Sequence, residues 1–200
     1  MKILTGMFLQ FCVCMLLCLP FSAAVAQDSS PTPPGAGISR EDANREYFSD
    51  VEVITQDGER LRFYSDVLKD RVVLINFFYI NCPTAPPGMI GLFRAQKLLG
   101  DELGKDIFFI SISVDPENDT PQAVKEYASK FNPPKGWIFL TGSKNGMDLI
   151  NRKLGNRLSL PEGHIQNLLM GNVKTGNWMR MPPSAPPAAV AEGLRSLRQQ

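Results

Sequence analysis

The spacing of apolar residues along the chain predicts alternating strands and helices. Two nearly continuous apolar runs, at 72–78 and 107–114, are typical of strands buried on both faces of a mostly parallel sheet. A shorter strand is expected at 137–140. Helices are expected from apolar residues at helical spacing at 92–103, 121–131, 147–154 and 190–197. This order indicates an α/β fold with a central mixed sheet flanked by helices.

Two hairpins are expected at the two ends of this alternation. Residues 51–55 and 60–64 alternate apolar and polar side chains around Asp57-Gly58, which is the signature of a tight turn. The second hairpin is expected at 165–170 and 176–180, with its turn at Gly171-Asn172. Trp178, in the second hairpin, is interpreted as a core residue.

The first 26 residues are interpreted as a secretory signal peptide. Lys2 precedes an apolar stretch at about 7–19, and a run of small residues ends in Ala24-x-Ala26. The apolar stretch is shorter than the roughly 20 residues of a membrane span. We expect cleavage after Ala26 and a periplasmic or otherwise exported protein. An uncleaved anchor, or lipoprotein processing at Cys18, would also export the domain.

Residues 27–45 are expected to form a flexible linker and residues 46–200 a single domain. The linker begins with Ser, Pro, Thr and Gly residues that bury too little apolar surface to offset their ordering entropy. Without Lys2, the chain carries 20 basic and 20 acidic side chains. This balance gives no electrostatic reason to expect nucleic acid or an anionic membrane surface as a partner, although loose membrane association stays open.

Signal cleavage would leave Cys82 as the only cysteine, because Cys12, Cys14 and Cys18 precede the cleavage site. In an oxidising compartment a lone cysteine is buried and inert, a metal ligand, or a thiol that reacts with another molecule. Cys82 follows the strand at 72–78 and precedes a predicted helix, whose dipole would stabilise a thiolate. We therefore favour a functional cysteine over an inert one.

Three short stretches of the chain carry a family resemblance. They are the strand and loop Val72–Pro83, ending in Cys82-Pro83, the turn Ser113-Val-Asp-Pro-Glu-Asn-Asp-Thr-Pro121, and Gly163-His164-Ile165. Together they resemble the Sco/SenC family, thioredoxin-fold copper-handling factors associated with assembly of the copper centre of respiratory oxidases. The resemblance covers about residues 51–197. It implies a thioredoxin-like fold with an N-terminal hairpin extension, and copper bound by cysteine thiols and the late histidine, His164.

The chain departs from the family pattern C-x-x-x-C-P at one ligand. It has Cys82-Pro-Thr-Ala-Pro86-Pro87, so that Pro86 stands in the place of the second cysteine. Proline has no thiol, and the change removes one ligand and the dithiol couple. Cys82 and His164 would remain, a thiolate and an imidazole that suit copper better than hard cations. Three methionines are weaker candidates for a third ligand, and we do not rely on them: Met89, Met179 and Met181.

Three acidic residues in the second stretch, Asp115, Glu117 and Asp119, have the residue types of an acid/base pair. Turn chemistry accounts for them more simply, because Asp before Pro favours a turn and Thr120-Pro121 is typical of a helix start. Asp115 would end the strand next to that of Cys82. We therefore expect these residues to be structural.

The resemblance implies an accessory protein in copper delivery to, or maturation of, a respiratory oxidase. Such a protein is a metallochaperone or assembly factor more than an enzyme. Its partner would be an oxidase subunit or another copper or thiol protein. Two alternatives stay open. Cys82 could be the catalytic thiol of a peroxidase-like protein or of a mixed-disulfide redox partner, or the chain could be a non-catalytic binding domain.

Overall fold

The computed structural model describes residues 37–83, 85–156, 161 and 167–200. One seven-stranded sheet runs through them, in the order β2-β1-β5-β4-β3-β6-β7. The strands are β1 (Glu52–Thr55), β2 (Arg60–Arg62), β3 (Val72–Phe78), β4 (Ile107–Ser113), β5 (Trp137–Thr141), β6 (Leu168–Asn172) and β7 (Asn177–Met181). The helices are α1 (Arg40–Phe48), α2 (Ala85–Leu99), α3 (Pro121–Ser129), α4 (Lys144–Lys153) and α5 (Pro187–Gln199), with a π-helical turn η1 (Phe63–Leu68) and a 3-10 helix η2 (Gly100–Glu102).

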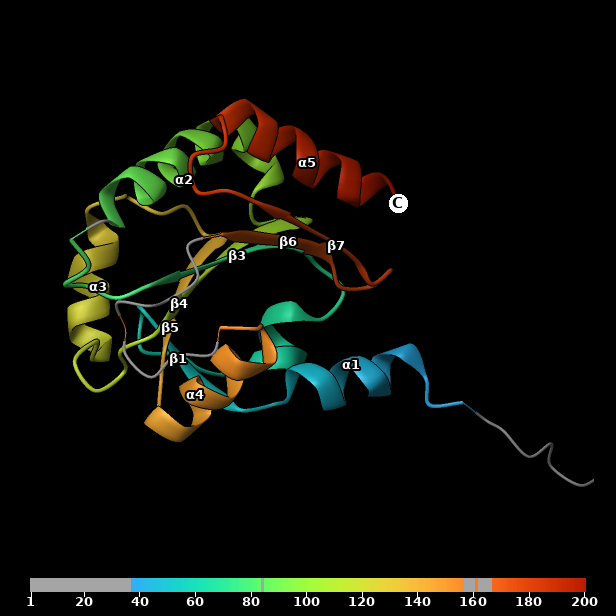
Figure 1. Ribbon diagram of the computed structural model, residues 1–200, viewed down its shortest axis with the longest axis horizontal. Coiled ribbons are helices and arrows are strands. Elements are labelled where there is room, and N and C mark those ends of the chain that lie inside the picture. Colours follow the sequence, from blue (N-terminus) through green and yellow to red (C-terminus); the bar gives the residue numbers. More distant parts are fainter. Residues whose placement is uncertain (1–36, 84, 157–160, 162–166) are drawn as a thin grey trace, which may run out of the picture. The chain divides into compact units, whose positions relative to one another are not determined.

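Helices cover both faces of the sheet, as the sequence predicted (Figure 1). The central strands β3, β4 and β5 are parallel, and the outer pairings are antiparallel. Side chains of β3 alternate between two buried clusters. Leu74 packs with α2, α3 and α5, and Ile75 packs with α1, η1 and α4. Every residue of β3 is therefore buried, which explains its nearly continuous apolar run.

The predicted N-terminal hairpin is present, but its second strand is shorter than expected. Strand β1 pairs with β2 around Gly58, whose φ of 83° suits glycine, and it also joins the main sheet through β5. The second strand ends at Arg62 rather than at Tyr64. From Phe63 onward the buried residues follow a helical spacing, and they are Phe63, Tyr64, Val67 and Leu68. The alternation of the strand therefore gives way to η1.

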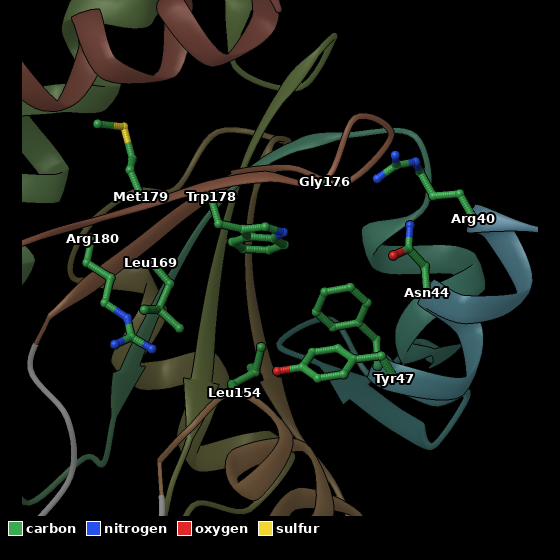
Figure 2. Close-up of a pocket in the computed structure, with 10 residues that line it drawn as sticks. Arg40, Asn44, Tyr47, Leu154, Leu169, Gly176, Trp178, Met179 and Arg180 are labelled. Carbon is green, nitrogen blue, oxygen red and sulfur yellow. The ribbon is translucent and has the colours of Figure 1, made fainter.

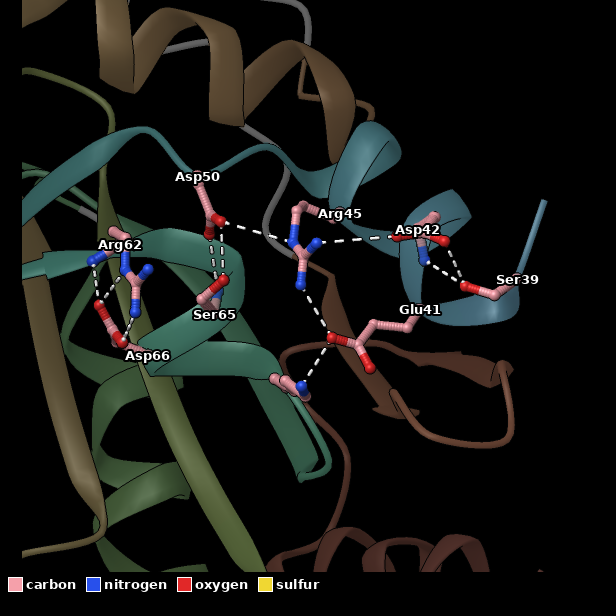
Figure 3. Close-up of polar contacts among 9 residues, drawn as sticks. Ser39, Glu41, Asp42, Arg45, Asp50, Arg62, Ser65 and Asp66 are labelled. Carbon is pink, nitrogen blue, oxygen red and sulfur yellow. Dashed lines mark hydrogen bonds and ion pairs between the residues drawn. The ribbon is translucent and has the colours of Figure 1, made fainter.

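Residues 40–45, which the sequence placed in the linker, belong to α1. Ser39 caps this helix by accepting a hydrogen bond from the Asp42 N–H at 3.1 Å. The Lys69 Nζ lies 2.6 Å from the Glu41 carboxylate, and Arg45 lies 3.8 Å from Asp50 (Figure 3). Asp50 in turn accepts hydrogen bonds from Ser65 of η1, so both contacts connect α1 to η1 or to the residue that follows it. The predicted signal peptide at 1–26 and the start of the linker at residue 27 stay predictions.

The turn of the second hairpin lies beyond the predicted position. Gly171 and Asn172 are inside β6, where they pair with Trp178 and Asn177. The side-chain oxygen of Asn172 accepts hydrogen bonds from the N–H groups of the next turn residues, at 3.1 and 3.2 Å. An asparagine that bonds the backbone in this way forms an Asx turn, which places the reversal after it. Of the helices in the described part of the chain, none combines the length and the hydropathy of a membrane span.

Gly171 is needed because the Trp178 indole lies against its backbone. A Cβ at this position would overlap the six-membered ring of the indole. We expect Gly171→Ala to lower the free energy of unfolding by about 1–3 kcal/mol, because the ring must move. Urea unfolding checks this, and the same change in a Trp178→Ala background should cost less. Equal costs in both backgrounds would contradict the assigned contact.

Candidate functional site

Cys82 lies in the loop that joins β3 to α2, three residues before α2 begins. Its N–H donates a hydrogen bond to the Tyr79 carbonyl oxygen at 3.1 Å, which closes a turn just after β3. The residue is buried, with 8% of its surface exposed. The structure therefore places Cys82 between the carboxyl end of a buried strand and the start of a helix, the position expected from the sequence.

A buried carboxylate holds this loop in place. One oxygen of Asp119 accepts a hydrogen bond from the Ile80 N–H at 3.1 Å, and the other accepts from the Ser113 hydroxyl at 2.6 Å. The Asp119 carbonyl oxygen also accepts from the Thr141 hydroxyl at 2.7 Å. Asp119 thus connects the Cys82 loop to the ends of β4 and β5. The turn role expected for Asp119 is only part of its function, because the side chain is buried and bonds residues distant in sequence.

Burial raises the pKa of Asp119 to about 6, and the nearby charge of Asp115 adds to the increase. The hydrogen bonds from Ser113 and Ile80 act in the opposite direction because they favour the carboxylate. Asp115 and Thr120 do have the local roles predicted for them. Asp115 accepts from the Asn118 side chain, and Thr120 caps α3 by accepting from the Ala123 N–H.

The pKa of Asp119 predicts an unusual dependence of stability on pH. Between about pH 4 and 6 the folded chain holds a proton that the unfolded chain has released, so stability falls as the pH rises through this window. Relative to Asp119→Asn, the wild-type protein should lose up to about 3 kcal/mol of unfolding free energy between about pH 4 and 7. Carboxylates with lowered pKa values, such as Glu102, contribute equally to the pH dependence of both proteins, so their contributions cancel in the comparison. Urea unfolding across this range is the test, and parallel profiles would refute the prediction.

Tyr127 of α3 belongs to the same neighbourhood. Burial raises its pKa to about 12, and the negative charges of Cys82 and Asp119 contribute to the shift. Its ring stacks on Phe78, the last residue of β3, with centroids 5.4 Å apart. The phenol is therefore protonated at neutral pH and forms an aromatic wall beside the loop. Cys82 is close enough to this phenol to influence its pKa, and it is itself buried, with little access to water.

The other predicted ligand, His164, lies outside the described residues, so its relation to Cys82 stays a prediction. Pro86, which stands in the place of a second cysteine, belongs to the first turn of α2. Within the described ranges there is no group of three or more His, Cys, Asp and Glu side chains that could hold a metal ion. These residues supply one copper donor of the predicted set, the sulfur of Cys82.

The methionine candidates pack inside the protein or against α5. The sulfur of Met89 lies 3.5 Å from the Asn76 side-chain nitrogen, within the core under α2. Met179 and Met181 of β7 face α5 together with Met170 of β6. Their ends lie 2.9–3.5 Å from the position that a Cβ on Gly193 would take. This packing agrees with the sequence interpretation, in which the methionines were not relied on as ligands.

A mixed sheet with helices on both faces, and a cysteine in the loop before a helix, is the arrangement of thioredoxin-like proteins. A family model for SCO1/SenC matches residues 40–159, and the chain therefore belongs to the SCO1/SenC family. This match includes Cys82 and the turn at 113–121. It ends before His164, so it does not test the third stretch that suggested the family.

Relatives and solved structures agree with this assignment. An SCO2-like protein of Rickettsia conorii is 34% identical over 116 residues, which is 58% of this chain and 55% of the relative. The chain thus spans about half the length of the curated relatives it matches. Two structures share the fold. Arabidopsis thaliana ScoI with copper bound has a TM-score of 0.62 and 23% identity, over 77% of this chain and 99% of that one. BsSco, a member of the Sco family of cytochrome c oxidase assembly proteins, has a TM-score of 0.63 and 26% identity, over 76% and 93%.

Proposed function

We propose that this chain is an exported accessory factor in copper delivery to, or maturation of, a respiratory oxidase, with Cys82 as its essential copper ligand. The observation that carries the proposal is the position of Cys82. It occupies the loop between β3 and α2 in a chain of the SCO1/SenC family, and a buried carboxylate fixes that loop. A related fold, Arabidopsis thaliana ScoI, has been solved with copper bound.

Copper is the cargo in this proposal, and its ligands are Cys82 and His164. A soft thiolate and a borderline imidazole are donors that copper prefers over the oxygen ligands of hard cations. The described residues fit only the thiolate half of this set, because His164 lies outside them. Two protein ligands hold an ion less tightly than three, which favours its release to an acceptor protein.

The site works without an internal disulfide. Pro86 stands where the family pattern has a second cysteine, and the three other cysteines lie in the predicted signal peptide. A single thiol cannot cycle between dithiol and disulfide, so any thiol exchange would need an external partner. This favours a role in handling copper over a role as a disulfide reductase.

Export and the partner complete the proposal. The segment at 1–26 has the pattern of a signal peptide, which would deliver the domain to the periplasm. A respiratory oxidase subunit that takes up copper there would be the acceptor. The membership of BsSco in a family of cytochrome c oxidase assembly proteins supports this choice of partner.

Complementation in cells that lack the chain tests the function. The wild-type gene should restore both oxidase activity and the copper content of the oxidase, and Cys82→Ala should restore neither although the protein accumulates normally. Added copper should partly rescue the deletion. If Cys82→Ala complements fully, the proposed role of the thiol is excluded and the non-catalytic binding domain becomes the better account.

A further inference from the structure

A cavity of 610 Å³ lies between α1 and the sheet edge formed by β7. Three aromatic rings, two leucine side chains and two guanidinium groups dominate its lining, and they are Tyr47, Phe48, Trp178, Leu154, Leu169, Arg40 and Arg180 (Figure 2). Its volume is in the range of about 300–1,000 Å³ found for small-molecule sites. Neither Cys82 nor Asp119 is among the described residues that line it.

The aromatic wall of the cavity is held in place by the sheet. The Trp178 indole lies over Gly171 of β6, where no side chain competes for the space. Its centroid is 5.7 Å from that of Phe48, which comes from α1. Trp178 nevertheless has 39% of its surface exposed, so the expectation that it is a core residue is wrong. One face of the ring is fixed on the sheet, and other parts of it are open to a ligand.

Hydrogen bonds fix α1 on both sides of the cavity. The Asn44 side chain donates to the Val173 carbonyl oxygen at 3.0 Å, next to β6. On the other side, the Tyr47 hydroxyl donates to the Lys153 carbonyl oxygen at 2.7 Å, at the end of α4. Since both sides are anchored, the cavity exists before any ligand binds. A preformed site loses less entropy on binding than one that must be ordered.

The polar lining is positively charged. No Asp or Glu is among the described residues that line the cavity. Arg40 uses one nitrogen to donate to the Thr175 carbonyl oxygen, at 2.9 Å. The Arg180 guanidinium makes no hydrogen bond or ion pair with any other described residue, whereas that of Arg195 pairs with Glu102 at 2.7 Å. The Arg180 guanidinium is therefore available to an anion.

We propose that this cavity binds a small organic acid with a flat apolar body. The carboxylate would pair with Arg180, whose planar guanidinium matches a carboxylate through two parallel hydrogen bonds. The apolar body would lie against Trp178 and Phe48, because aromatic faces favour offset or edge contacts with other flat groups. Arg40 adds positive charge at the opposite end of the cavity (Figure 2).

Calorimetric titration with matched acids and amides tests this proposal on the exported protein. The probes are benzoate, 2-naphthoate and indole-3-acetate, each paired with its uncharged amide of nearly the same shape. At least one acid should bind with 1:1 stoichiometry, and about tenfold more tightly than its amide, because only the acid can pair with Arg180. If no acid binds below about 5 mM, or if acid and amide bind equally, the proposal is overturned.

Two variants locate the binding. Arg180→Gln should weaken the acid about tenfold and leave the amide unchanged, since it removes the charge and keeps a polar side chain of similar reach. Arg94→Gln is the matched control, because Arg94 is exposed on α2, outside the cavity lining, and has no ion pair among the described residues. Equal weakening by both variants would indicate nonspecific attraction to surface charge and would refute the site.

Discussion

Pro86→Cys is expected to tighten copper(I) binding by on the order of 100-fold or more. The variant creates the C-x-x-x-C spacing that the family resemblance implies, with three residues between Cys82 and a second thiol in the first turn of α2. A third soft ligand held on the same chain acts at a high effective concentration, so it adds affinity without the cost of bringing in a separate molecule. The helix should tolerate the change. The N–H group that cysteine adds lies in the first turn, where N–H groups have no partner within the helix.

Anaerobic competition with a chromophoric copper(I) chelator measures this gain. Pro87→Cys is the matched control, since it removes a neighbouring proline and adds the same thiol one position along the helix. It should raise the affinity far less, because successive positions of a helix are turned by about 100° around its axis. Equal gains from the two variants would show that any nearby thiol suffices and that position 86 has no special geometry.

The second large effect is expected for Asp119→Ala, which should lower the free energy of unfolding by about 2–4 kcal/mol. The variant leaves the Ile80 N–H and the Ser113 hydroxyl without their acceptor in a buried place, and each unsatisfied buried group costs about 1–3 kcal/mol. Because Ile80 is in the Cys82 loop, hydrogen exchange in that loop should also accelerate.

Asp119→Asn separates loss of these hydrogen bonds from loss of charge. The amide keeps the shape and one oxygen acceptor, so at neutral pH this variant should unfold within about 1 kcal/mol of the wild-type protein. Asp148→Ala serves as a surface control, because its carboxylate pairs with Lys144 at an exposed position, where such pairs contribute little. A loss for Asp119→Ala no larger than that control would mean that the buried contacts do not stabilise the loop.

The sheet and four of the five described helices could be predicted because their patterns are local. The run at 72–78 and the Thr120-Pro121 start of α3 identify their elements without knowledge of the rest of the chain. Helix α1 could not be predicted in this way. Phe48 is its only buried residue, and contacts with distant residues such as Val173 hold it in place. The turn after Asn172 was missed because the Gly171-Asn172 pair resembles a turn, whereas Gly171 accommodates the Trp178 ring.

The candidate site was only partly visible in the sequence. Cys82 could be found from its place between a strand and a helix. The role of Asp119 could not, because its partners Ile80 and Ser113 come together only when β3 and β4 pair. The cavity beside Trp178 has no sequence signal at all, since its walls come from α1, the end of α4 and the last hairpin. A metal-binding residue can therefore be recognised from a sequence motif, whereas the residues that position it are recognised only from the structure.

Copper(I) titration of the purified protein, with and without Cys82, tests the central claim most directly. The wild-type protein should bind one equivalent in competition with a chromophoric chelator, and X-ray absorption of the complex should show a copper–sulfur shell. Cys82→Ala should lose both signals while keeping its circular dichroism spectrum. If the wild-type protein binds no copper more tightly than Cys82→Ala, Cys82 is not a copper ligand and the proposed copper-handling function is contradicted.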